Sequence, residues 1–196
     1  AMEILVGYAE YPTTKITENS YKYRTLGLGY NNLGGLLMVS GFPYDSDEGR
    51  RYAASITALM TGRAYRQSAF IAEAMGPFEG FSVDREAMLG VIDKHWQAVP
   101  EQHLDDPIWH KAILAWGSAR GLGQLHGYRN AQVSLCQPGG TVSFALDCAT
   151  TGIEPEVALV NYKKLSGGGT IKKTNALVGR ALFNLGYTNN GIWNIE

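Results

Sequence analysis

The segment from Gly127 to Pro155 constrains the fold most, because apolar residues alternate with other residues on both sides of a glycine-containing loop. The alternating positions are Ala131, Val133 and Leu135 before the loop and Val142, Phe144 and Leu146 after it. Apolar side chains at every second position are typical of a β-strand. The sequence therefore predicts two strands joined by the loop Pro138–Thr141.

The composition of this loop suits the binding of an anion. Two adjacent glycines can adopt positive φ and expose backbone N–H groups, and the Thr141 hydroxyl adds a further donor. Such a loop can hold a phosphate. Proline followed by glycine is equally the pattern of an ordinary β-turn, so the local sequence leaves a plain turn open as the alternative.

The size and charge of the chain exclude several functions. Its 196 residues match one domain, and a hydrophobic content of 45% is enough to form a buried core. Seventeen basic and 18 acidic residues produce no broad positive field, which argues against nonspecific binding to nucleic acid or to a membrane surface. The sequence shows neither a long apolar run nor a signal-peptide pattern, and it predicts a cytoplasmic protein.

The cysteines and histidines show no pattern of metal binding. Cys136 and Cys148 are too few for a disulfide framework or a four-ligand zinc site, and we expect both to be buried, with a redox-active cysteine as the alternative. His95, His103, His110 and His126 are scattered, without carboxylates at ligand spacing. Glu154 is expected to be a buried carboxylate with a structural hydrogen bond, and a catalytic role is the alternative.

Helical spacing of apolar residues recurs along most of the chain. The predicted helices run from Met2 to Ala9, from Leu28 to Leu37, from a capping box at Asp45 and Glu48 to Gly76-Pro77, from Ser82 or Asp84 to Trp96, from Asp106-Pro107 to Trp116, and from Leu177 to Leu185 before Gly186. Helices followed by buried strands indicate an α/β fold. Both ends look like interrupted elements, so we expect a chain cut at both ends.

Four short motifs occur in an order and at a spacing that resemble the large catalytic subunit of ribonucleotide reductases, most closely its adenosylcobalamin-dependent class. They are Tyr23–Tyr30, Pro43–Gly49, Arg129–Gln132 and Thr150–Pro155. The resemblance runs from Glu3 to Gly186. It implies that residues 1–196 are a partial catalytic barrel domain, a helix-rich segment followed by strands of the ten-stranded α/β barrel of that family.

The resemblance also implies a site. These enzymes reduce ribonucleotides to deoxyribonucleotides by thiyl-radical chemistry, and their radical and redox cysteines lie in segments that this chain does not match, so no catalytic residue is expected here. The loop that holds the substrate phosphate typically reads Ala-Pro-Thr-Gly-Thr-Ile-Ser in the cobalamin class. Its counterpart is Gln137–Ser143, which assigns phosphate binding to Pro138, Gly139, Gly140, Thr141, Val142 and Ser143. Gly139 stands where the family usually has threonine and removes one hydroxyl donor.

For the complete enzyme the resemblance implies adenosylcobalamin, a ribonucleotide substrate, deoxynucleotide effectors and a thioredoxin-like reductant, and it leaves a homo-oligomer open. One alternative is the class that obtains its radical from a separate metal-containing subunit. Its phosphate loop tends to carry Glu or Ser where Gly140 and Val142 stand here. A second alternative is a noncatalytic nucleotide-binding module derived from the barrel.

Overall fold

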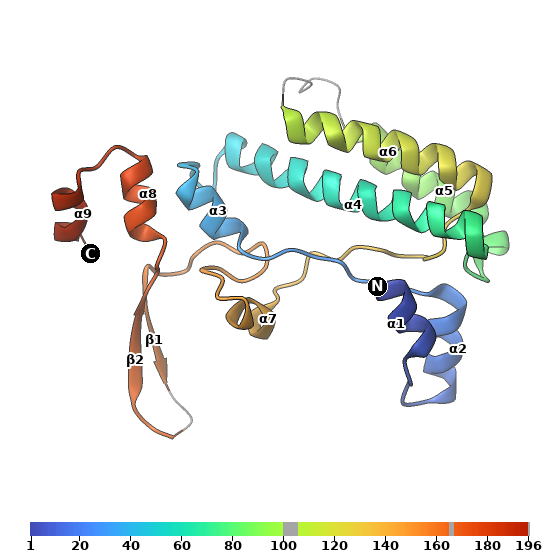
Figure 1. Cartoon of the computed structure of the whole chain (residues 1–196), viewed down its shortest axis with the longest axis horizontal. Coiled ribbons are helices and arrows are strands. Elements are labelled where there is room, and N and C mark those ends of the chain that lie inside the picture. The colour runs from blue at the N-terminus through green and yellow to red at the C-terminus, as the bar shows by residue number, and fades with distance from the viewer. Residues whose placement is uncertain (100–105, 165–166, 196) are drawn as a thin grey trace. The chain divides into compact units, whose positions relative to one another are not determined.

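A computed structural model of the protein describes residues 1–99, 106–164 and 167–195. The chain divides into two compact units, one of residues 1–28 and 54–135 and the other of residues 29–53 and 136–196. The elements are α1 (Met2–Tyr8), α2 (Thr14–Tyr23), α3 (Leu33–Val39), α4 (Asp47–Met75), α5 (Phe81–Gln97), α6 (Pro107–His126), α7 (Gly140–Ala145), β1 (Val160–Lys164), β2 (Thr170–Thr174), α8 (Val178–Asn184) and α9 (Asn189–Ile195) (Figure 1).

The first unit is built around an aromatic core contributed by α4, α5, α6 and the turn after α6. Tyr65, Phe81, Trp116 and Tyr128 are all buried there. The polar atoms of two of these rings bond to main chain: Trp116 Nε1 donates to the Ala58 carbonyl at 2.9 Å, and the Tyr128 hydroxyl donates to the Ala119 carbonyl at 2.9 Å. Burial raises the pKa of Tyr128 well above its usual range.

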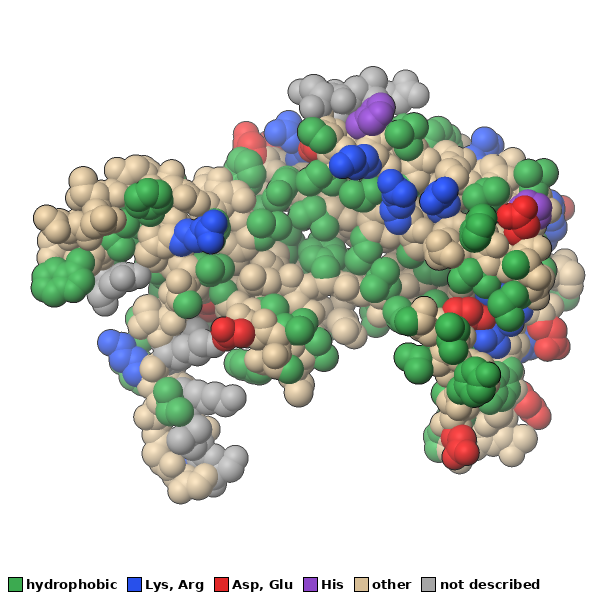
Figure 2. Space-filling view, in the orientation of Figure 1, with side chains coloured by type: hydrophobic (Ala, Val, Ile, Leu, Met, Phe, Trp, Pro, Cys, Tyr) green, Lys and Arg blue, Asp and Glu red, His purple; other side chains and the backbone are tan. Residues whose placement is uncertain are grey.

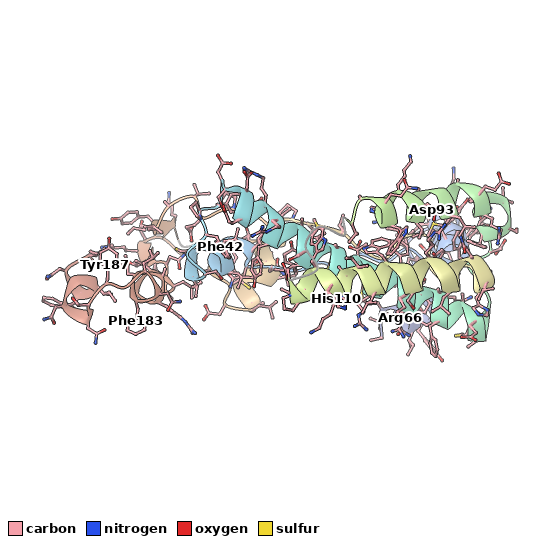
Figure 3. The ribbon with its side chains drawn as sticks, turned by 90° about the horizontal axis from the view of Figure 1, so that it is seen from above. Phe42, Arg66, Asp93, His110, Phe183 and Tyr187 are labelled. Atoms are coloured by element: carbon pink, nitrogen blue, oxygen red, sulfur yellow. The ribbon has the colours of Figure 1, made fainter. Side chains whose placement is uncertain are left out.

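Polar side chains on the outside of this bundle also connect its helices. Arg66 on α4 donates from Nε to Ser118 Oγ on α6 at 3.1 Å, and Asp93 on α5 accepts from Arg120 Nε on α6 at 2.5 Å (Figure 3). His95 stacks on Trp116 with ring centroids 5.0 Å apart, so this histidine serves packing. His103 lies outside the described residues, and no group of metal-ligating side chains is found among the residues that are described.

Several helix ends follow the signals in the sequence. The Asp106 carboxylate accepts from the N–H groups of Ile108 and Trp109, at 2.8 and 3.3 Å, and Pro107 is the first residue of α6. Gly76 and Gly186 adopt positive φ where α4 and α8 have ended. No helix in the described part of the chain is both long and apolar enough to cross a membrane.

The start of α4 differs from the predicted capping box. The helix begins at Asp47, and the Ser46 hydroxyl accepts from Gly49 N–H at 3.0 Å. Asp45 pairs instead with Arg50, at 2.6 Å between Oδ1 and Nη1. The cap is therefore Ser46, because its hydroxyl sits one residue before the helix and reaches the orphan N–H group three residues later.

The helix predicted from Leu28 is α3, and it begins only at Leu33. Leu28 instead forms a parallel bridge with Ser134, and its N–H donates to the Val133 carbonyl at 3.0 Å. Residues 131–135 are thus extended beside residues 26–28, which agrees in part with the strand predicted before the loop. The pairing is a single bridge and not a full strand.

The strand predicted after the loop is wrong. Residues 140–145 form α7, in which Ser143 N–H donates to the Gly139 carbonyl at 2.7 Å. Val142 and Phe144 are 48% and 59% exposed, and Figure 2 shows hydrophobic side chains at the surface over α7. Local hydrogen bonds satisfy the backbone of so short a segment, and six residues are too few for alternation to distinguish a strand from a helix.

The second unit also contains α3, α8, α9 and the antiparallel hairpin of β1 and β2. The register pairs Val160 with Thr174 and Lys164 with Thr170, and both Gly168 and Gly169 in the turn have positive φ. Helices α3 and α8 contact each other, and Asn184 Nδ2 donates to the Val39 carbonyl at 2.9 Å. The described part of the chain is therefore helix-rich, with little sheet.

Candidate functional site

The predicted phosphate-loop residues lie together in the second unit, but their exposure differs. Pro138, Gly140, Thr141 and Val142 are exposed, Gly139 is half-buried, and Ser143 is 1% exposed. Gly139 has φ +63° and precedes α7, whereas Gly140 is the first residue of that helix. Either of the two adjacent glycines could adopt a positive φ, but only Gly139 does so.

The first turn of α7 carries several hydrogen-bond donors. The N–H groups of Gly140, Thr141 and Val142 come before the first intrahelical bond of α7, which Ser143 N–H donates to Gly139. The exposed Thr141 hydroxyl lies on the same turn. N–H groups and a hydroxyl on one short turn are the donors that an oxyanion accepts from.

Ser143 is already engaged within the protein. Its hydroxyl donates to Asn31 Oδ1 at 2.9 Å, and its carbonyl accepts from Cys148 N–H at 2.9 Å. This buried hydroxyl therefore anchors the end of the loop to Asn31.

Two adjacent asparagines organise the segments around the loop, and sequence reasoning missed both. Asn31 Oδ1 accepts from Ser143 Oγ and also from Gly152 N–H at 3.1 Å. Asn32 Oδ1 accepts from the N–H groups of Ala149 and Thr150 at 3.0 and 3.1 Å. Their one sequence signal is a pair of polar residues between the motif Tyr23–Tyr30 and an apolar helix.

Thr150–Pro155 packs against residues from two other parts of the second unit. Thr150 is buried, and its Oγ1 accepts from Gly35 N–H at 3.2 Å. Tyr44, from the motif Pro43–Gly49, donates its hydroxyl to the Ile153 carbonyl at 2.6 Å. Glu154 has the expected structural bond, accepting from Thr151 Oγ1 at 2.5 Å, but it is exposed, which corrects the prediction of a buried carboxylate.

A pocket of about 510 Å³ lies next to this loop within the second unit. Three carboxylates, those of Asp147, Glu154 and Glu156, line it together with Ser143, and no Lys or Arg is among the described lining residues. Negative charge disfavours an anion inside the pocket. The exposed turn Gly139–Val142 does not line the pocket.

The two cysteines are less buried than predicted. Cys136 is exposed, and Cys148 is half-buried beside the pocket. Both thiols are free in the structure.

In the first unit, two of the four motifs meet in a buried ionic network. Glu3 Oε1 accepts from Arg24 Nε at 2.5 Å and from Arg129 Nε at 2.8 Å, while Glu3 Oε2 accepts from Asn130 Nδ2 at 2.6 Å. Ser68 Oγ donates to Asn130 Oδ1 at 2.8 Å. These side chains bond to one another, which makes the network a structural clamp and not a ligand site.

Comparison with known proteins identifies what the chain is similar to. The family model described as "Ribonucleotide reductase, barrel domain" matches residues 1–195. The vitamin B12-dependent ribonucleotide reductase of Agrobacterium fabrum is 47% identical over all of this chain and 17% of its own length. That of Streptomyces coelicolor is 47% identical over 95% of the chain and 20% of its own length.

A more distant relative is the vitamin B12-dependent ribonucleoside-diphosphate reductase of Mycobacterium tuberculosis, which is 28% identical over 85% of the chain. It is matched over 19% of its own length. The chain thus spans about a fifth of the length of these curated relatives.

Proposed function

The chain belongs to the barrel-domain family of ribonucleotide reductases, and from this premise we propose that it supplies the substrate-phosphate loop of a vitamin B12-dependent reductase. In that protein it forms part of the ten-stranded α/β barrel, and Pro138–Ser143 bind the phosphate of a ribonucleotide that is reduced to a deoxyribonucleotide. The observation that supports this proposal is the exposed turn of donors at Gly140, Thr141 and Val142, in the segment whose sequence resembles the family's phosphate loop.

The loop would act by binding and orientation alone. A phosphate placed against the turn would accept from backbone N–H groups and from the Thr141 hydroxyl, and each such bond to a charged group contributes about 1.5–3 kcal/mol. Gly139 carries no side chain that could shield the turn. Cleavage of the ribose 2′-C–O bond is assigned to the radical chemistry of other parts of the enzyme.

The class of reductase follows from the relatives. Those named above are all vitamin B12-dependent enzymes, which favours adenosylcobalamin over a separate metal-containing radical subunit. We assign none of the described residues to the corrin itself. No step is therefore assigned to cobalamin in this chain.

The partners of the complete protein belong to the same proposal. The substrate is a ribonucleotide, deoxynucleotides act as effectors and a thioredoxin-like protein supplies reducing equivalents in the cytoplasm. On this view the chain by itself forms no deoxynucleotide when it is supplied with adenosylcobalamin, a dithiol and ribonucleotides. Reproducible deoxynucleotide product from the pure chain would contradict the absence of catalytic residues from it.

Steady-state kinetics of the full-length parent enzyme tests the role of the loop. Thr141→Val keeps the shape of the side chain and removes one donor, so we expect KM for the ribonucleotide to rise about tenfold with little change in kcat. Thr170→Val makes the same chemical change on an exposed strand position outside the loop and should leave KM unchanged. Equal KM values for the two variants would contradict phosphate binding by Thr141.

A further inference from the structure

We infer that Asn31 is a positioning residue for the loop Pro138–Ser143. We also infer that the Asn31 side chain can take its place only because residue 139 is a glycine, so that the two positions depend on each other. The geometry of the loop supports this inference directly, whereas its consequence for substrate rests on the proposed function. Asn31 lies more than 100 residues before the loop in the sequence, yet its Oδ1 accepts hydrogen bonds from Ser143 in the loop and from Gly152 beyond it.

Two donors converge on one oxygen atom of the Asn31 side chain. Ser143 Oγ and Gly152 N–H both donate to Asn31 Oδ1, at 2.9 and 3.1 Å. Ser143 and Gly152 are both buried. Gly152 N–H has one other, longer bond, to Ser143 Oγ at 3.4 Å. Removing the acceptor would leave the Ser143 hydroxyl without this partner and Gly152 N–H with the longer bond alone, and a poorly satisfied buried donor loses part or all of its hydration without full compensation.

A side chain at position 139 would also clash with Asn31. A Cβ atom built on Gly139 would overlap Asn31 Oδ1, at a separation that real Cβ atoms essentially never show. Gly139 also has φ +63°, which side chains rarely adopt. The Asn31 amide therefore occupies the space that a side chain at position 139 would need. Gly140 provides the contrast, because a Cβ atom there meets nothing within 4 Å.

Both bonds to Asn31 use its oxygen as an acceptor. Asn31→Asp keeps an acceptor oxygen at the same place, so the loop should remain closed. The new carboxylate would add a negative charge beside a turn that is proposed to hold phosphate. This variant therefore separates the positioning role from the identity of the ligand.

Amide hydrogen exchange in the full-length enzyme measures the positioning role. We expect Asn31→Ala to raise the exchange rate of the Gly152 amide about tenfold or more, while Asn31→Asp leaves it unchanged. The Ala149 and Thr150 amides, which donate to Asn32, serve as an internal control and should keep their protection in both variants. Unchanged exchange at Gly152 in Asn31→Ala would overturn the inference.

A double-mutant cycle tests the steric dependence by the same readout. Gly139→Ala should speed exchange of the Gly152 amide. If the two positions are coupled, the acceleration in the double variant Asn31→Ala, Gly139→Ala should be at least about threefold smaller than the product of the two single accelerations. Gly140→Ala should not speed exchange of the Gly152 amide. A double variant that equals the product contradicts the coupling. If Gly139→Ala fails to fold, exchange of the Gly152 amide in Asn31→Ala alone decides the inference.

The ligand is tested separately through the KM for ribonucleotide. Asn31→Asp should raise KM about tenfold or more without a matching fall in kcat, because a carboxylate near the phosphate repels it in the bound state. If KM is unchanged while Gly152 stays protected, the loop does not bind phosphate and the proposed function fails. The positioning role of Asn31 would survive that result.

Discussion

The two units use their polar side chains in different ways. In the first, Glu3 and Arg129 belong to a buried network of charges whose members satisfy one another. In the second, the neutral side chains of Asn31 and Asn32 bond to main-chain N–H groups and leave the turn at Gly140 and Thr141 exposed. The buried charges of the first unit maintain the fold, whereas we propose that the exposed turn of the second unit presents donors to a ligand.

The largest expected effect breaks the network of the first unit. Glu3→Ala leaves the buried Arg24 and the half-buried Arg129 without a counter-charge, so we expect a loss of about 3–5 kcal/mol in the free energy of unfolding. Denaturant unfolding of the full-length enzyme, followed through this domain, measures it. Asp45→Ala removes an exposed partner of Arg50 and should leave stability unchanged. Similar stabilities for the two variants would show that the buried network is not a clamp.

A smaller effect concerns the aromatic core of the same unit. Tyr128→Phe removes the buried bond to the Ala119 carbonyl, and we expect a loss of about 1 kcal/mol in the free energy of unfolding. The main-chain acceptor loses its partner, but the ring continues to fill the core. Unfolding at pH 7 provides the value, and a variant as stable as the parent would show that this bond contributes nothing.

The raised pKa of Tyr128 adds a dependence on pH. Burial keeps this phenol protonated in the folded state, whereas the unfolded chain loses the proton near pH 10. The unfolded state then binds fewer protons than the folded state, so stability falls as pH rises above 10. Tyr128→Phe should reduce the steepness of that fall. Identical slopes for parent and variant above pH 10 would contradict the assignment to Tyr128.

The smallest effect distinguishes the two glycines of the second unit. Gly140→Ala places a better helix former at the start of α7 in open space, so we expect a gain of up to about 1 kcal/mol in the free energy of unfolding. Gly139→Ala should destabilise, because of its positive φ and its contact with Asn31. Thermal unfolding of both variants gives the comparison. Equal shifts in one direction would contradict the different roles of the two positions.

The sequence predicts those elements whose signals are local. Asp106-Pro107 and Gly76 mark helix ends through caps and positive φ, and both are confirmed. Helix α2 was missed because it is mostly polar and buries none of its residues, although Thr13 caps it. The hairpin β1–β2 was missed because consecutive lysines stand in both strands, at 163–164 and 172–173, and a run of charge gives no apolar alternation.

The candidate site was predictable only in part. The loop composition and the family resemblance indicate the segment Pro138–Ser143, but they do not show that Ser143 is buried or that residues 140–145 are helical. Asn31 could not be found from local pattern, since its partners Ser143 and Gly152 are 112 and 121 residues away. A long-range bond of a neutral side chain to the backbone leaves no periodic signal in a single sequence.

The central claim is that the exposed turn of the second unit binds the phosphate of a ribonucleotide. The most direct test compares the binding of a ribonucleotide and of its nucleoside, which lacks phosphate, to the full-length enzyme and to its Thr141→Val variant. We predict that the variant binds the nucleotide about tenfold more weakly and the nucleoside with unchanged affinity. An equal loss for both ligands, or no loss for either, would contradict phosphate recognition by this loop.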